Sequence, residues 1–115
     1  MSAVRSDPAP QPPSLKPMTI GVLDAVLAIE VQAYTFPWSR GNFVDSLAAG
    51  YLLRVLQSPG GEVLGYFVAM PGFEEMHLLN ITVAAAHEGR GYARLMLSQL
   101  YALSAHHEAG ARTRS

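Results

Sequence analysis

The segment HEGRGYAR, residues 87–94, holds the residue types that could bind a phosphate group. Gly89 and Gly91 let the backbone approach a ligand closely because they carry no Cβ atom. Arg90 and Arg94 can donate charge-assisted hydrogen bonds to phosphate oxygens. Because the segment connects a predicted strand to a predicted helix, backbone N–H groups and the helix dipole would converge at one spot. We therefore predict a loop that binds a pyrophosphate.

The two common nucleotide-binding motifs do not match this loop. A Walker loop needs the triplet Gly-Lys-Ser/Thr, which the chain lacks. The dinucleotide fingerprint needs a third glycine and an early parallel strand, whereas GRGYAR follows a predicted antiparallel meander. Glu88 is a further obstacle, because a carboxylate about 4 Å from a phosphate costs about 1 kcal/mol in water. We expect weakened anion binding, with the Glu88 side chain turned to solvent.

The histidines do not indicate a metal site. His106 and His107 are adjacent on a predicted helix, so their side chains point in different directions and suit a helix end better than one metal ion. His77 lies in a predicted strand and His87 in a loop, and no pattern brings them together. With no cysteine in the chain, a thiolate site is excluded, so no metal is predicted.

Two helices are predicted in the first half of the chain. The segment TIGVLDAVLAIEVQAY, residues 19–34, repeats apolar residues at helical spacing, and Thr19 is a plausible N-cap. Pro37 should break this helix, Ser39 can cap a shorter second helix, and Gly50 can end that one in a left-handed conformation. The apolar stripe is predicted to face the core and to carry no chemistry.

Three strands and a third helix should follow. The segments YLLRVLQ, EVLGYFVAM and FEEMHLLNITV are typical of strands, and the glycines and prolines of SPGG and PG mark tight turns between them. After His87 the chain returns to helical spacing, and the residues before the first helix could add a short strand. We predict an α/β (α+β) fold, in which a mostly antiparallel sheet is packed by helices.

Composition and length suggest one domain with an arm. Residues 1–17 hold five of the eight prolines and are predicted to be a disordered arm, followed by a domain over 18–110 and a tail over 111–115. The net charge is −1 without a charge block, so neither nucleic acid nor a membrane surface is an expected partner. The absence of cysteines and of an apolar signal segment is consistent with a cytoplasmic protein.

The order of these elements, together with LLNITVAAAHEGRGYARLML, resembles the Gcn5-related N-acetyltransferases, the GNAT family. The family's cofactor loop has the pattern Gln/Arg-x-x-Gly-x-Gly/Ala, which falls on residues 88–93. The segments AYTFPWSRGNF and HLLNITV resemble one branch especially, the bacterial ribosomal-protein-alanine N-acetyltransferases of the RimI type. The Phe-Pro-Trp-Ser run is the more specific of these signatures. The resemblance covers about residues 18–110.

The resemblance implies that acetyl-CoA is the co-substrate. The strand would contact its acetyl and pantetheine parts, the glycine loop would hold its pyrophosphate, and the implied cofactor residues are Ile81, Thr82, Val83, Glu88, Gly89, Arg90, Gly91, Tyr92, Ala93 and Arg94. The loop of Phe36, Pro37 and Trp38 would line a groove for the acceptor. The implied reaction is attack of a free N-terminal α-amine, that of alanine in a ribosomal or other protein, on the thioester carbonyl.

The chain departs from the family pattern at two places. Glu88 stands where the family has Gln or Arg. The chain also ends after EAGARTRS, where the family continues with a strand, a helix and a hairpin that carry the usual catalytic glutamate and tyrosine. We therefore expect a truncated or frameshifted member without the C-terminal strands, with impaired activity and no assignable catalytic residue. The alternative is a non-catalytic fragment that self-associates through the open edge of the strand ending at Val83.

Four further side chains have both a structural and a functional interpretation. Glu75 lies near the position where some family members carry a base, although a solvated turn explains it more simply. Tyr34 and Tyr92 could donate a proton to a leaving group, and packing is again the simpler explanation. Trp38 could pack onto Phe43 at the start of the second helix, line the acceptor groove, or do both.

Overall fold

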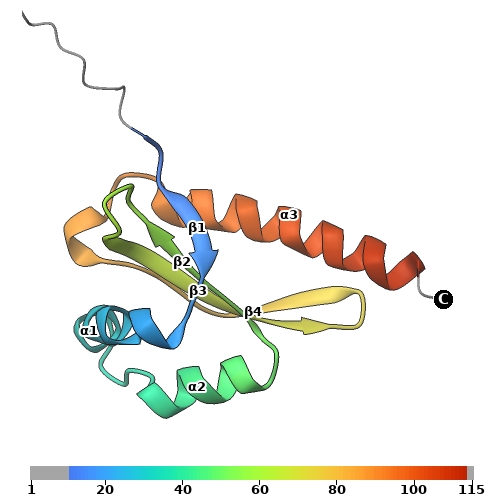
Figure 1. Ribbon diagram of the computed structural model, residues 1–115, viewed down its shortest axis with the longest axis horizontal. Helices are drawn as coiled ribbons and strands as arrows, with labels where there is room; N and C mark the ends of the chain where they lie inside the picture. The colour runs from blue at the N-terminus through green and yellow to red at the C-terminus, as the bar shows by residue number, and fades with distance from the viewer. Residues whose placement is uncertain (1–10, 114–115) are drawn as a thin grey trace, which may run out of the picture.

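Four strands form one antiparallel sheet in the order β1-β2-β3-β4, shown in Figure 1. The computed structural model describes residues 11–113, with side chains up to residue 105. The strands are β1 (Ser14–Pro17), β2 (Leu52–Gln57), β3 (Val63–Gly72) and β4 (Glu75–Val83). The helices are η1 (Ile20–Val22), α1 (Leu23–Ala33), α2 (Arg40–Ala48), η2 (Ala85–His87) and α3 (Tyr92–Thr113). The predicted antiparallel sheet packed by helices is therefore confirmed.

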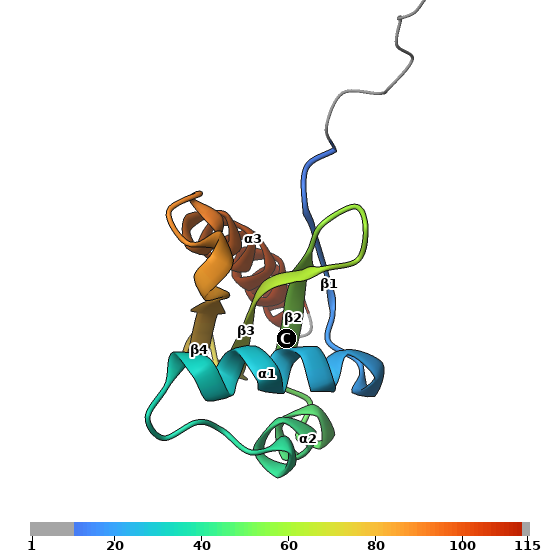
Figure 2. The same ribbon diagram turned by 90° about the vertical axis from the view of Figure 1, so that its left-hand side faces the viewer.

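The helices cover both faces of the sheet. Figures 1 and 2 show α1 and α2 on one face and α3 on the other. The side chains of β3 alternate between the two faces: Tyr66 and Val68 join the core under α1 and α2, while Phe67 and Ala69 join the core under α3. Because both faces of this central strand are covered, its residues 63–69 are all buried.

Local signals in the sequence account for the ends of α2. The Ser39 side chain accepts a hydrogen bond from the Asn42 backbone N–H, and the Asn42 side chain accepts one from the Ser39 N–H, which forms a capping box. Gly50, just beyond the helix, has a φ of 81°, the left-handed conformation that glycine adopts without a steric penalty. Both predictions for this helix are confirmed.

The start of α1 differs from the prediction. Thr19 precedes the short helix η1, and its side chain caps neither η1 nor α1. The helix α1 itself begins only at Leu23 and ends at Ala33, ahead of Pro37. The turn of η1 reorients the chain from the direction of β1 before α1 begins, so the apolar periodicity did not mark the first residue of α1.

The turn between β3 and β4 was also predicted at the wrong residues. Pro71 and Gly72 are the last residues of β3, where they pair with Met76 and Glu75. The turn is formed instead by Phe73 and Glu74, and Glu74 has a φ of 56°. Pro71 is tolerated in the strand because β2 pairs with β3 no further than Ala69, so the missing N–H leaves no bond to β2 unmade.

The domain boundaries lie outside the predicted ones. The last four residues of the expected arm form β1, which pairs with β2, so the predicted short strand exists and the folded part begins before residue 18. The helix α3 continues to Thr113 and includes most of the expected tail. His106 and His107 therefore lie within α3 and not at its end, and their side chains lie outside the described residues, as do residues 1–10 and 114–115.

Candidate functional site

Within residues 11–113 no strand pairs with the outer edge of β4, and the backbone groups of this strand alternate in direction. The Ala84 N–H donates to the Leu64 carbonyl on β3 at 2.9 Å. Hydrogen bonding alternates along an antiparallel strand, so the backbone N–H and C=O of Thr82 also point toward β3. The backbone N–H and C=O groups of Ile81 and Val83 point toward the free edge. The Ile81 carbonyl accordingly accepts a hydrogen bond from outside the sheet, from the Tyr34 hydroxyl at 3.2 Å.

A β-bulge interrupts β4 beside this edge. Val68 pairs with Asn80 and Ala69 pairs with Leu78, so Leu79 has no partner on β3. The extra residue changes which side chains face α1, as bulges do next to many functional sites. Beyond the bulge, the side chains of Asn80 and Thr82 turn toward α1 and are buried.

A buried carboxylate on α1, that of Glu30, accepts a hydrogen bond from the side chain of Asn80. Glu30 is 1% exposed. Its Oε1 accepts from the Tyr66 hydroxyl at 2.6 Å and from the Asn80 amide at 3.1 Å, and its Oε2 accepts from the Trp38 backbone N–H at 3.0 Å. One side chain thus joins α1, β3, β4 and the loop before α2.

The hydrogen bonds of Thr82 and Asn80 run in sequence toward Glu30. Thr82 donates to the Asn80 oxygen at 2.8 Å, and the Tyr34 hydroxyl lies 2.8 Å from the Thr82 oxygen. Because the single proton of Thr82 is committed to Asn80, the Thr82 oxygen can only accept here, and the one proton of Tyr34 is shared between Thr82 and the Ile81 carbonyl. Every described group in contact with the Glu30 carboxylate is a hydrogen-bond donor. Burial first, and then the hydrogen bond to Glu30, raise the pKa of Tyr66 above its ordinary value.

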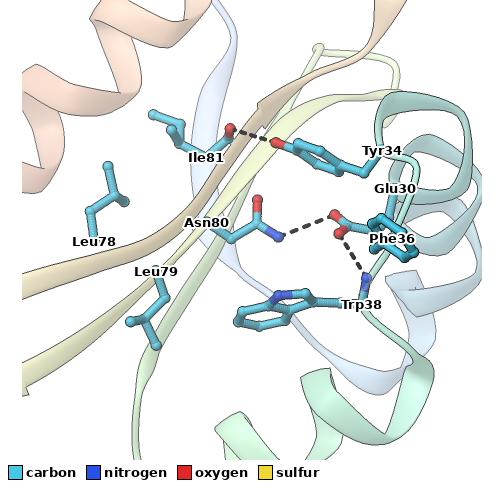
Figure 3. A pocket seen from close by; sticks show the side chains of 8 residues that line it. All are labelled: Glu30, Tyr34, Phe36, Trp38, Leu78, Leu79, Asn80 and Ile81. Atoms are coloured by element: carbon cyan, nitrogen blue, oxygen red, sulfur yellow. Dashed lines mark hydrogen bonds between the residues drawn. The ribbon is translucent and has the colours of Figure 1, made fainter.

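A pocket of about 380 Å³ opens over this network. Figure 3 shows Glu30 and Asn80 facing each other at its base, with Tyr34 at one side and Trp38 at the other. Its lining residues come from α1, the loop between α1 and α2, and the bulged part of β4: Glu30, Tyr34, Phe36, Trp38, Leu78, Leu79, Asn80 and Ile81. The pocket combines apolar walls with one anionic group.

The glycine loop presents unused backbone donors at the start of α3. Gly89 and Gly91 have φ values of 79° and 80°. Leu95 makes the first helical bond, to the Gly91 carbonyl at 3.0 Å. Among the described residues, no acceptor is found for the six backbone N–H groups of residues 89–94. A helix N-terminus is the positive end of the helix dipole, and with this many free donors it suits an anion.

The charged side chains of this loop lie at the surface. Glu88 is exposed, as expected, and Arg90 and Arg94 are exposed as well. His87 contacts Glu62 at 2.9 Å and Arg90 at 3.3 Å, which ties the loop to the turn between β2 and β3.

The residues predicted for the acceptor lie partly at the pocket. Phe36 and Trp38 line it, and Pro37 between them is exposed and is not part of the lining. Trp38 also packs on Phe43 with ring centroids 5.2 Å apart, which confirms the packing interpretation, while its role in a groove for the acceptor stays a prediction.

The other side chains considered from the sequence differ in their positions. Tyr34 reaches the edge of β4 and lines the pocket. Glu75 instead pairs with His77 at 2.9 Å and does not line it, while Tyr92 packs against the core under α3. In the part of the chain with described side chains, no three His, Cys, Asp or Glu residues form a possible metal site. No helix between residues 11 and 113 is long and apolar enough to cross a membrane.

The sequence reasoning missed Glu30 and Asn80, the two central residues of the network. A signal for Glu30 was present, because Leu23, Val26 and Glu30 lie at helical spacing on the buried face of α1. A single carboxylate within such an apolar stripe must find hydrogen-bond partners in the core. No comparable signal marked Asn80, because its inward direction depends on the bulge at Leu79.

Two curated relatives are acetyltransferases of ribosomal protein bS18. The chain is 29% identical over 73 residues to the [Ribosomal protein bS18]-alanine N-acetyltransferase of Haemophilus influenzae. It is 28% identical over 72 residues to the enzyme of that name from Haemophilus ducreyi. Each match covers 63% of this chain and 49% of the relative, so the chain spans about half the length of the curated relatives it matches.

Solved acetyltransferase structures share the fold. The ribosomal-protein-S18-alanine N-acetyltransferase of Escherichia coli superposes with a TM-score of 0.73 at 25% identity, over 80% of this chain and 59% of that one. The GNAT family N-acetyltransferase YhbS of Escherichia coli, solved with CoA, gives a TM-score of 0.71 at 17% identity, over 87% of this chain and 59% of that one. Arabidopsis thaliana Naa50, solved with the bisubstrate analogue CoA-Ac-MVNAL, gives 0.65 at 14% identity, over 79% and 63%.

The family model for acetyltransferases covers most of the chain. It matches residues 23–114, from the start of α1 through α3, and so includes the bulged strand, the free edge and the glycine loop. The resemblance seen in the sequence is thus confirmed at the level of the family. The chain belongs to the acetyltransferase (GNAT) family.

Proposed function

We propose that this protein binds acetyl-CoA and transfers the acetyl group to the N-terminal α-amine of a polypeptide. The observation that carries the proposal is the arrangement of two features on β4 and its continuation: the pocket at the bulge, and the free N–H groups of residues 89–94. The outward backbone groups of Ile81 lie at the pocket, and those of Val83 lead on toward the loop. A ligand along this edge would present one end to each feature.

The glycine loop is assigned the pyrophosphate of CoA. The six free N–H groups and the N-terminus of α3 supply donors and positive potential without any side chain. Exposed Arg90 and Arg94 can add charge-assisted hydrogen bonds. In the Escherichia coli relative solved with CoA the same fold holds this cofactor, which supports the assignment. The pantetheine would pair with the outward backbone groups of Ile81 and Val83, as an added strand does.

The pocket at the bulge is assigned the acceptor. Its walls of Phe36, Trp38 and Leu79 suit a small or apolar first residue, and its opening at Ile81 lies beside the edge assigned to the thioester. The Naa50 structure contains a bisubstrate analogue with a peptide part, and the two curated relatives are named for an alanine acceptor. A protein N-terminus, with a ribosomal protein as one candidate, is therefore the proposed acceptor.

The reaction joins the amine nitrogen to the thioester carbonyl carbon, and the carbon–sulfur bond breaks. The amine loses one proton and the leaving thiolate gains one. The role of this chain is to hold both reactants at adjacent positions on β4, an effect of proximity and orientation. An outward N–H of β4 can polarise the thioester carbonyl. The Tyr34 hydroxyl, held against Ile81 and Thr82, is the proton donor that the described residues offer at this position.

Two further expectations stay predictions. One is the cytoplasmic location. The other is self-association through the free edge of β4, for which a strand edge with unpaired backbone groups is the reason. The relatives reported above are named as acetyltransferases, so they support the enzymatic function rather than a non-catalytic module. Light scattering with and without CoA tests the association directly.

The test of the function is transfer of a labelled acetyl group. The protein is incubated with acetyl-CoA and a short peptide that begins with alanine, and the mass of the peptide is followed. The matched control is the same peptide with a blocked N-terminus, which has no α-amine to accept the group. We expect a gain of one acetyl group on the free peptide alone. No transfer above the uncatalysed rate would refute the proposal.

A further inference from the structure

Glu30 carries a buried negative charge that no cation compensates. Among the described residues its partners are a backbone amide, a tyrosine hydroxyl and a side-chain amide. The ion pairs of the described residues all involve other carboxylates. A buried carboxylate is normally paired with a positive charge, because hydrogen bonds from neutral groups recover only part of its lost hydration. A ligand with a positive charge could compensate the charge of Glu30.

The carboxylate also has room for a further donor. A carboxylate offers about four acceptor positions on its two oxygens. Oε1 uses two of them, with Tyr66 and Asn80, whereas Oε2 uses one, with the Trp38 N–H. Glu30 belongs to the lining of the pocket at the bulge, and Figure 3 shows its carboxylate facing the space between Phe36, Trp38 and Asn80. Oε2 therefore keeps an acceptor position that no described residue uses, on a side chain that belongs to the pocket lining.

No other charged group lines this pocket. Its other walls are three aromatic side chains, three aliphatic side chains and one amide. These are Tyr34, Phe36, Trp38, Leu78, Leu79, Ile81 and Asn80. The titratable groups bonded to the network are the hydroxyls of Tyr34 and Tyr66. Within the described part of the chain, no lysine, arginine or histidine contributes to it. The field of Glu30 in the pocket is therefore not cancelled locally, and an anion would be repelled.

We propose that Glu30 is the ammonium-recognition residue of the acceptor site: it holds the protonated α-amine of an incoming polypeptide before transfer. The inference rests on the proposed function, which it deepens by naming the group that selects the acceptor. The ammonium donates to Oε2, and the first side chain lies against Phe36 and Leu79. In this role Glu30 captures the acceptor and is not the base, so its effect belongs to KM. The ammonium then loses one proton to solvent, and the resulting neutral amine is the nucleophile in the transfer.

Binding without acetyl-CoA tests this assignment. Trp38 is the single tryptophan of the chain and lines the pocket, so its fluorescence reports occupancy. The probes are a pentapeptide that begins with alanine and its N-acetylated twin, which lacks the cation. We expect the free peptide to bind at least about tenfold more tightly, the ratio expected for one charge-assisted hydrogen bond. Equal binding of the two peptides, or no binding of the free one, would overturn the proposal.

The pH dependence gives a second reading on the unmodified protein. The α-amine of a peptide titrates at about 7.7–8.0, so the ammonium form is lost as the pH rises through that range. We expect the affinity for the free peptide to fall about tenfold between pH 7 and pH 9, while the affinity for the acetylated twin stays constant. A flat profile for the free peptide would contradict an ammonium contact. Turnover, which needs the neutral amine, would rise over the same range.

Variants separate the charge of Glu30 from its role in the fold. Glu30→Gln should abolish the preference for the free peptide, whereas Asp45→Asn, which removes a charge from the exposed surface of α2, should preserve it. Tyr66→Phe removes a donor and keeps the charge, so the preference should survive. Loss of the preference in Tyr66→Phe as well would assign Glu30 a purely structural role. Alaninamide distinguishes the source of the ammonium: binding as tight as that of the peptide keeps the ammonium contact and argues against a polypeptide acceptor.

Discussion

At the scale of single residues, the site depends on side chains that contact more than one element. Glu30 bonds to groups on β3, on β4 and in the loop before α2, and Asn80 joins it to Thr82. Each bond runs from a neutral donor toward one anion, so removing a donor leaves part of that charge unsatisfied. Trp38 is fixed by its backbone rather than by its ring nitrogen. The ring can therefore serve as a pocket wall while packing on Phe43.

The charge of Glu88 sets the first prediction at this scale. Glu88→Gln should strengthen CoA binding by several-fold, because it removes a repulsion of about 1 kcal/mol or less from an exposed carboxylate near the pyrophosphate. Titration calorimetry with CoA at low and high salt measures it. The gain should shrink at 1 M salt, where the screening length is about 3 Å. A gain that does not depend on salt would argue against a Coulomb effect.

At the scale of elements, the position of α3 depends on a glycine in the central strand. A Cβ atom at Gly65 would lie 2.6 Å from the Thr82 carbonyl oxygen and 2.9 Å from Cε of Met96. Met96 is fully buried and anchors α3 to the sheet. The absence of a side chain at Gly65 therefore allows β3, β4 and α3 to approach closely. Through α3 it also sets where the glycine loop lies relative to β4.

Gly65→Ala should consequently destabilise the protein by about 1–3 kcal/mol, the usual cost of overpacking a core. The Met96 side chain can move, but the Thr82 carbonyl belongs to the backbone of β4 and cannot yield without loss of register. Chemical denaturation gives the free energy of unfolding. Gly60→Ala is the matched control, because a Cβ there meets only the Ser58 hydroxyl, at 3.8 Å. Equal stability of the two variants would show that the close approach is not required.

At the scale of the whole molecule, the layers followed from patterns in the sequence, and the site did so only in part. Apolar periodicity indicates three helices and three strands over residues 19–107, and the glycine loop is visible as a motif. The network at Glu30 was not predictable in the same way, because Glu30 and Asn80 are 50 residues apart in the chain. Their contact requires the hairpin, the bulge at Leu79 and the packing of α1, each of which depends on tertiary structure.

Local errors have the same origin. The proline and glycine at 71 and 72 carry the residue types of a turn, yet they lie in β3 because the pairing of β3 with β4 extends past them. A short strand was expected before the first helix, but the prolines around residues 14–17 placed the four residues of β1 within the predicted arm. Their pairing with β2 stabilises them at the edge of the sheet, where a proline is tolerated. Long-range pairing thus overrode local propensity at both places.

Ligand binding should be visible in the stability of the whole domain. If the glycine loop holds CoA, the free energy of unfolding rises with CoA concentration, by about 2.7 kcal/mol at one hundred times the dissociation constant.

Gly91→Ala places a Cβ at a φ of 80°, which costs about 1–2 kcal/mol without CoA and redirects the neighbouring N–H groups. Gly50→Ala carries the same strain at a φ of 81°, at the end of α2 and away from the loop. Thermal unfolding with and without CoA therefore compares two variants of similar intrinsic stability. We expect the gain from CoA to be preserved in Gly50→Ala and reduced in Gly91→Ala, by about 1.4 kcal/mol for each tenfold loss of affinity. An equal gain in both variants would mean that the anion binds elsewhere on the molecule.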